Sequence, residues 1–282
     1  MLKKGMRWGC AGPWYWEFQN FDKDPNISQL RFLLKNEMNL AGLSLGALAK
    51  LTPAQLDAYK AFVAEHDIKV LTHVAWNSID ASDDENKRRT DEAVALLTRH
   101  HDLFKDTVVV TMSCAGQRFD RRIPLPQRLE RLARNLAPLA KACYELGTPL
   151  AMENREDLYC SDLVELCQAT PHLRIFLDTG NTYLIGERPL PAIEAAAPYV
   201  VGCHFKDHRV TSNPQILKFE IFGSPLGDGD VGLAQAWDIL LRKTPNPRNL
   251  MMELEMIAPQ GMNPLECMAQ SLEFIKSLPD PA

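Results

Sequence analysis

Four short apolar runs in the second half of the chain each end in a side chain that can bind a metal ion or transfer a proton. These side chains are Glu153, Asp178, His204 and Glu253. Three carboxylates gathered in one buried place repel one another, and a bound cation relieves that repulsion. Carboxylate oxygens with one imidazole suit Mn2+ or Mg2+, and Co2+ or Zn2+ are alternatives. The pattern predicts one divalent metal ion where the ends of these four runs meet, with Mn2+ as the expected ion.

A fifth acidic residue, Glu255, lies two positions after Glu253 and therefore on the same face of the same strand. It is an alternative ligand in place of Glu253, an orienting neighbour, or a solvated charge at the rim. Glu253 is the preferred ligand.

These residues need a fold that brings the ends of several strands together. Eight β-rich runs alternate with amphipathic helical stretches such as 83–100 and 126–146. The runs are Met6–Gly12, Leu40–Leu45, Ile68–Trp76, Thr107–Cys114, Pro149–Asn154, Leu173–Thr179, Val200–Lys206 and Asn249–Met256. Several are almost continuously apolar, which is typical of strands covered on both faces.

Eight strands separated by helices predict an α/β fold, a (β/α)8 TIM barrel that forms a single domain over residues 1–282. In such a barrel the chemistry lies at the carboxyl ends of the strands. A doubly wound open sheet is the alternative, but Gly9–Gly12 leads into Pro13 and Trp14 instead of a helix.

The composition narrows the classes of protein and of partner. With 46% hydrophobic and 24% charged residues, the chain has the balance of a soluble globular protein. Its formal net charge of −5 argues against a general nucleic-acid binder. No apolar run approaches the roughly 20 residues that span a bilayer, and the N-terminus lacks the apolar region of a signal peptide. We therefore expect a cytoplasmic protein with no nucleic-acid or membrane partner.

Five segments that carry these polar residues resemble a known family. They are Met152–Asn154, Leu177–Asn181, His204–Asp207, Pro225–Asp230 and Met252–Glu255. They are similar to the sugar phosphate isomerase/epimerase superfamily, the xylose isomerase-like TIM-barrel group that includes ketose 3-epimerases, inosose dehydratases and endonuclease IV. The resemblance implies the same metal set of Glu153, Asp178, His204 and Glu253.

Two departures from the family pattern bear on the reaction. Asn181 stands where ketose 3-epimerases commonly have a histidine, and the pair Gly180-Asn181 is more typical of inosose dehydratase-like members. Ser44 stands where the second strand of the family often ends in glutamate.

The resemblance does not fix the reaction, because one site serves several chemistries in this superfamily. A metal-dependent carbohydrate isomerase or epimerase is the preferred prediction. A metal-bound carbonyl would acidify the neighbouring C–H group, and an enediolate would form when that proton leaves. Glu153 and Glu253 would pass protons to and from opposite faces of the substrate. A lyase or dehydratase acting on a keto-sugar, an inosose or a keto-glycoside is the alternative, and a non-catalytic sugar-binding barrel is a further one. A metal phosphodiesterase is weaker, because the chain offers too few ligands for three zinc ions.

Further candidates follow the predicted strands. His73 and His208 are candidate acid–base residues, and the alternative for each is a structural histidine or a solvated loop residue. Seven residues are candidates for binding the substrate, and the alternatives are core aromatics or solvated charges. These seven are Trp14, Trp16, Trp76, Glu156, Asn181, Lys206 and Arg209.

The segment 210–231 is longer than most loops, so we expect a lid over the site. Its apolar side chains could equally contact a partner subunit, which makes a homo-oligomer possible. The expected substrate is a small carbohydrate.

Overall fold

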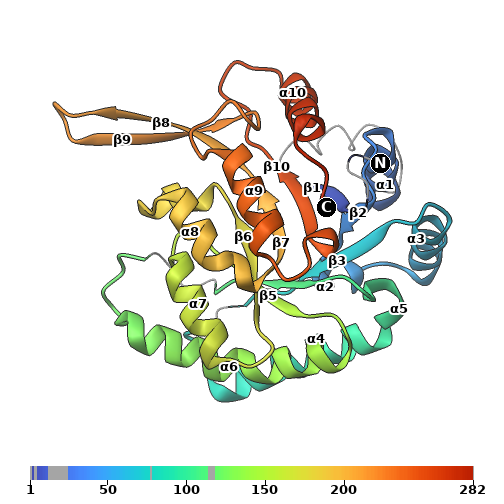
Figure 1. The fold of residues 1–282 in the computed structure, drawn as a ribbon. Coiled ribbons are helices and arrows are strands. Elements are labelled where there is room, and N and C mark those ends of the chain that lie inside the picture. The colour runs from blue at the N-terminus through green and yellow to red at the C-terminus, as the bar shows by residue number, and fades with distance from the viewer. Residues whose placement is uncertain (1, 3–4, 12–24, 77, 114–117, 282) are drawn as a thin grey trace.

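Eight parallel strands form one sheet that curls into a nearly closed barrel, as predicted (Figure 1). The computed structural model describes residues 2, 5–11, 25–76, 78–113 and 118–281. The sheet has the order β1-β10-β7-β6-β5-β4-β3-β2. Its strands are β1 (Arg7–Ala11), β2 (Leu40–Gly42), β3 (Lys69–His73), β4 (Val109–Thr111), β5 (Leu150–Glu153), β6 (Arg174–Asp178), β7 (Val200–Phe205) and β10 (Met251–Glu255).

The barrel closes where β1 meets β2. The backbone N–H of Asn39 donates to the carbonyl of Trp8 at 2.9 Å, and the Asn39 side chain accepts from the N–H of Trp8 at 3.3 Å. A β-carbon on Gly9 would lie 2.3 Å from the Leu40 carbonyl oxygen. The absence of a side chain at position 9 therefore lets the first and second strands approach each other.

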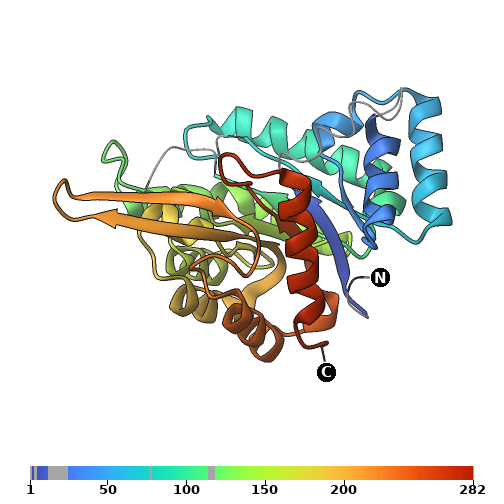
Figure 2. The same ribbon diagram turned by 90° about the horizontal axis from the view of Figure 1, so that it is seen from above.

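Helices surround the sheet (Figures 1 and 2). They are α1 (Pro25–Lys35), α2 (Leu45–Leu48), α3 (Pro53–Glu65), α4 (Asp83–Arg99), α5 (His101–Phe104), α6 (Leu125–Glu145), α7 (Cys160–Ala169), α8 (Pro189–Ala196), α9 (Leu233–Lys243) and α10 (Pro264–Ser277), with short 3-10 helices at Asn181–Ile185, Ala197–Tyr199 and Pro247–Asn249. Local sequence fixes their ends. Thr52 caps α3 reciprocally with Gln55, with Pro53 in the first turn, and Ser82 caps α4 by accepting from the N–H of Glu85.

The barrel interior is layered because alternate strand residues point inward. One separate cluster of buried apolar residues fills its middle, and its members come from six strands or the residues directly before them. They are Leu40, Leu71, Val108, Val110, Ala151, Phe176 and Met251. The position two residues further along four of these strands is polar and buried or half-buried, at His73, Glu153, Asp178 and Glu253. The apolar layer therefore forms a floor beneath a polar layer at the carboxyl end.

The segment that we expected to be a lid-like loop is largely a β-hairpin. β8 (Asp207–Asn213) pairs antiparallel with β9 (Lys218–Ser224), and both views show this hairpin projecting away from the barrel (Figures 1 and 2). Leu217 at its tip is 92% exposed. Across the part of the chain that the structure describes, no helix is long and apolar enough to cross a membrane.

Candidate metal centre

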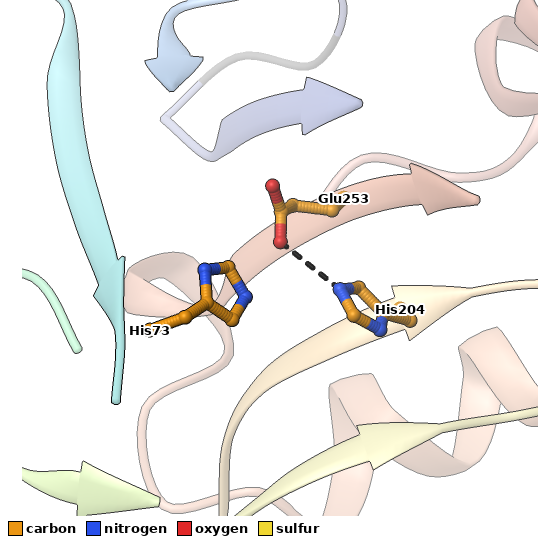
Figure 3. A group of neighbouring side chains, drawn as sticks. All are labelled: His73, His204 and Glu253. Atoms are coloured by element: carbon orange, nitrogen blue, oxygen red, sulfur yellow. Dashed lines mark hydrogen bonds and ion pairs between the residues drawn. The ribbon is translucent and has the colours of Figure 1, made fainter. Parts of the chain in front are cut away.

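His204 lies at the middle of the polar layer, with carboxylates on both sides of its ring. Its Nε2 lies 3.1 Å from Oε2 of Glu253 (Figure 3), and its Nδ1 lies 3.4 Å from Oε1 of Glu153. Oε2 of Glu255 also lies 3.1 Å from Nδ1, and an oxygen of Asp178 lies at 3.9 Å. The register explains this convergence, since Glu253 and Asp178 are the direct strand partners of His204 on either side.

Asp178 is fully buried, and its two oxygens have different partners. Oδ1 accepts hydrogen bonds from the backbone N–H groups of Gly180 and Asn181, both at 2.9 Å. Oδ2 accepts from Nζ of Lys206 at 3.2 Å. One oxygen is thus fixed by the turn that follows β6, and the other faces the centre.

Lys206 and Asn181 join the carboxylates into a network. Nζ of Lys206 donates to Oε1 of Glu255 at 3.0 Å and to Oδ1 of Asn181 at 3.3 Å. The Asn181 amide in turn donates to Oε1 of Glu153 at 3.5 Å. Both residues were predicted to bind substrate, and the structure gives each of them partners inside the centre.

Asn154 aligns two of the strands that carry the site. Pairing between β5 and β6 ends at Glu153 and Phe176, so Asp178 lies beyond the last paired residue. The Asn154 side chain replaces the missing backbone pairing. Its Nδ2 donates to the Asp178 carbonyl at 2.8 Å, and its Oδ1 accepts from the Asp178 N–H at 2.7 Å. We did not predict this role of Asn154 from the sequence, although Asn154 directly follows Glu153 within a segment that carries the family resemblance.

His73 enters the centre from β3, on the opposite side from β7. Figure 3 shows its ring turned toward Glu253 and His204. The two imidazole rings are 6.5 Å apart and nearly parallel, at 24°. Burial lowers the pKa of His73, so its imidazole is neutral at pH 7. A neutral ring can donate a hydrogen bond, accept a proton or bind a metal ion.

The donor atoms fit a divalent cation. His204 belongs to two overlapping groups of possible ligands, one with His73 and Glu253 and the other with Glu153 and Asp178. Within each group the ligand atoms lie within 4.8 Å of one another. Nδ1 of His204 is buried among carboxylates and makes no hydrogen bond of normal geometry with any residue that the structure describes. These observations suit an ion bound between β5, β6, β7 and β10.

The proton affinities reflect the excess of buried carboxylates. Burial opposes a charge on His204, but the carboxylates of Glu153 and Glu253 beside its two ring nitrogens hold its pKa well above the usual value. Burial raises the pKa of Asp178 to about 7 against the lowering effect of Lys206. Burial likewise disfavours the Lys206 cation, but Asp178 and Glu255 raise its pKa above the ordinary value. The cluster thus draws positive charge toward itself, which is the property a cation site requires.

His208 lies beside the centre instead of within it. Its buried ring packs against Gly180, where an added β-carbon would lie 2.7 Å from the ring. Burial lowers its pKa to about 4, with Lys206 acting in the same direction. His208 is therefore neutral at pH 7. It follows Asp207, whose carboxylate accepts from the N–H groups of Gly227, Gly229 and Val231 and so anchors that loop.

Three of the remaining predicted residues lie in the described part of the chain, and their side chains have other partners. Trp76 is buried and donates from Nε1 to Asn86 at 2.9 Å, and it lines a cleft of about 400 Å3 together with His73. Glu156 pairs with Arg155 at 3.4 Å, near the rim. Arg209 is exposed on the hairpin. Trp14 and Trp16 lie outside the described residues.

Comparison with known proteins identifies the family. The family model described as "Xylose isomerase-like TIM barrel" matches residues 37–278, which is most of the chain. The chain belongs to this family. A comparison with curated protein sequences gives no significant match.

Several solved structures share the fold at low sequence identity. D-psicose 3-epimerase from Clostridium cellulolyticum H10, solved with D-tagatose, has a TM-score of 0.72 and 15% identity, covering 98% of this chain and 100% of that one. A xylose isomerase-like TIM barrel protein from Mycobacterium smegmatis in complex with magnesium has a TM-score of 0.68 and 16% identity over 95% of both chains. The probable 3-DHS dehydratase involved in petrobactin synthesis from Bacillus anthracis has a TM-score of 0.68 and 13% identity, over 96% of this chain and 99% of that one.

Proposed function

We propose that this chain is a divalent-metal-dependent carbohydrate isomerase or epimerase that exchanges a proton on the carbon next to a substrate carbonyl. One observation carries the proposal: Glu253 and Glu153 lie on opposite sides of the His204 ring, at Nε2 and Nδ1. Two carboxylates that bracket one centre can remove a proton from one face of a substrate carbon and return a proton to the other face.

The metal ion would be held by Glu153, Asp178, His204 and Glu253, with Glu255 as the alternative to Glu253. When bound, it supplies Lewis acidity that polarises the carbonyl and stabilises the negative charge that develops on oxygen. Mn2+ is the expected ion, and Mg2+, Co2+ and Zn2+ are compatible with the same ligands.

The residues of the centre divide into those that transfer protons and those that orient the substrate. Glu153 and Glu253 transfer the protons, each through an oxygen that is free to reach the substrate. Lys206 keeps Asp178 and Glu255 in place and presents an ammonium to a substrate hydroxyl. Neutral His73 offers a hydrogen bond from the β3 side, and His208 is a candidate proton shuttle behind Gly180.

A dehydratase acting on a keto-sugar or inosose is the second candidate. It needs the same proton removal, after which the hydroxyl on the next carbon takes up a proton and leaves as water, and a carbon–carbon double bond forms in place of the second epimer. Asn181 in place of a histidine and the similarity of fold to a probable dehydratase favour this reading.

Proton NMR in D2O on the Mg2+-loaded enzyme tests the proposal with a panel of ketoses and inososes. An epimerase incorporates deuterium next to the carbonyl and produces a second epimer, whereas a dehydratase consumes the substrate with loss of a hydroxyl. Glu153→Gln and Glu253→Gln should each slow the exchange about a hundredfold or more, because general acid–base catalysis contributes that much. The control is Glu165→Gln, which removes an exposed carboxylate on α7.

The proposal fails if Glu153→Gln exchanges deuterium at the rate of the unchanged protein. It also fails if the protein binds sugars of the panel tightly and none of these sugars exchanges deuterium or reacts. That result would identify a sugar-binding barrel without catalysis.

A further inference from the structure

A cavity of about 630 Å3 lies at the opposite end of the barrel from the candidate metal centre. It is bounded by the amino ends of the strands, where Arg7 begins β1, Lys69 begins β3 and Arg174 begins β6. Its volume falls within the range of small-molecule sites, roughly 300–1,000 Å3. The apolar layer that contains Phe176 and Met251 separates it from the polar layer above.

The strand register places cations in this cavity. Lys69 precedes Leu71 and His73 by two and four residues, and Arg174 precedes Phe176 and Asp178 in the same way. Because side chains alternate along a strand, each of these two strands presents three inward residues in turn. The first is basic and faces the cavity, the second belongs to the apolar layer, and the third belongs to the polar layer of the candidate metal centre.

Positive charge dominates the cavity lining. Among the described residues, four cationic side chains line it against one carboxylate, that of Asp106, in a chain with a net charge of −5. The four are Arg7, Lys69, Arg174 and Arg248. A concave basic site in an acidic protein concentrates anions from solution.

Two of these cations keep hydrogen-bonding capacity for a ligand. Arg174 is half-buried, and the one hydrogen bond of its side chain within the described chain goes to the carbonyl of Leu173 at 2.9 Å, with no carboxylate among the side chain's described partners. Nζ of Lys69 has two partners, the Lys105 carbonyl and the Asp106 carboxylate, and both lie at the long distance of 3.5 Å. Arg7, in contrast, is committed to Asp67 through both of its terminal nitrogens. The guanidinium of Arg174 and the ammonium of Lys69 are thus the donors that a bound anion would use.

We propose that this cavity is a second binding site, which takes the phosphoryl group of a small molecule. Arg174 offers the planar fork that fits phosphate oxygens, and Lys69 adds a second charge. The half-buried ring of Tyr199 lines the same cavity and offers an apolar surface to the organic part of a phosphorylated compound. The proposal does not depend on the reaction carried out at the other end of the barrel.

Isothermal titration calorimetry at low ionic strength tests the proposal with inorganic phosphate, ribose 5-phosphate and unphosphorylated ribose as probes. Arg174→Gln and Lys69→Gln should each weaken phosphate binding about tenfold or more, because each removes a charge-assisted hydrogen bond. The matched control is Arg242→Gln, an exposed arginine that pairs with Asp238 on α9. Circular dichroism and thermal melting confirm that each variant is folded.

A separate comparison excludes the metal centre as the phosphate site. Titrations with and without added Mg2+ should give the same affinity, and added salt should weaken it. Inorganic phosphate binding as tightly as ribose 5-phosphate supports a site for the free anion, and tighter binding of ribose 5-phosphate supports a site for a phosphorylated metabolite. The proposal is overturned if neither phosphate probe binds, if binding requires Mg2+, or if Arg242→Gln weakens it as much as Arg174→Gln does.

Discussion

Replacing Asn154 with alanine should both destabilise the protein and weaken the metal centre. The β5–β6 ladder stops at Glu153, so the N–H and carbonyl of Asp178 depend on the Asn154 side chain for partners on that side. Truncation leaves two buried backbone groups unpaired, at about 1–3 kcal/mol each, and partial rescue by water lowers the sum. We expect the free energy of unfolding to fall by about 2–4 kcal/mol.

Urea denaturation monitored by circular dichroism measures this loss. The control is Asn213→Ala, which removes an exposed asparagine at the end of β8 and should change the stability by less than about 1 kcal/mol. Because Asp178 would no longer be aligned with Glu153, Mn2+ affinity should also fall about 10–100-fold. Unfolding of Asn154→Ala at the same urea concentration as the unchanged protein would refute this reasoning. A destabilised variant with unchanged Mn2+ affinity would show that Asn154 supports the fold and not the centre.

Three further predictions follow from the same structure. Glu253→Gln should abolish turnover, whereas Glu255→Gln should lower kcat/KM about 10–100-fold; equal losses would contradict the assignment of Glu253 as ligand. Burial raises the pKa of Asp157 to about 6, so the folded protein binds this proton more tightly and its stability falls as pH rises from about 4 to about 6. Asp157→Asn should therefore raise the free energy of unfolding by up to about 3 kcal/mol at pH 7.5 and by much less at pH 4.5; a gain independent of pH in urea titrations would contradict this. Gly180→Ala should cost about 1–3 kcal/mol, because its β-carbon would lie 2.7 Å from the ring of His208, and an unchanged melting temperature would argue against that contact.

The barrel could be predicted because each of its strands lies in a recognisable local run of β-forming residues. Runs such as Val108–Val110 and Ile175–Leu177 are apolar on both faces, and each of the eight predicted runs contains a strand of the sheet. Four of these runs deliver a metal-binding or proton-transferring side chain, and alternation places Glu253 and Glu255 on one face of the last strand. Periodicity alone therefore brings most of the candidate centre into one layer.

The hairpin and the alignment by Asn154 could not be predicted in this way. The turn between β8 and β9, residues 214–217, contains no glycine, and Leu217 adopts a positive φ of 50° that the sequence does not signal. Asn154 acts through the backbone of Asp178 on the next strand, a partner that only the register reveals. Lys206 follows a strand, as many solvated charged residues do, so the sequence does not distinguish it from them. Its hydrogen bonds to Asp178 and Glu255 depend on the spacing between β6, β7 and β10.

The most direct test of the central claim is an equilibrium measurement of Mn2+ binding. After treatment with a chelator and dialysis against Mn2+, the unchanged protein should retain one Mn2+ per chain, as measured by atomic absorption. Asp178→Asn should retain far less, while Glu165→Gln, which alters only an exposed carboxylate on α7, should retain the full amount. If Asp178→Asn binds Mn2+ with the stoichiometry and affinity of the unchanged protein, the cluster around His204 is not the metal centre.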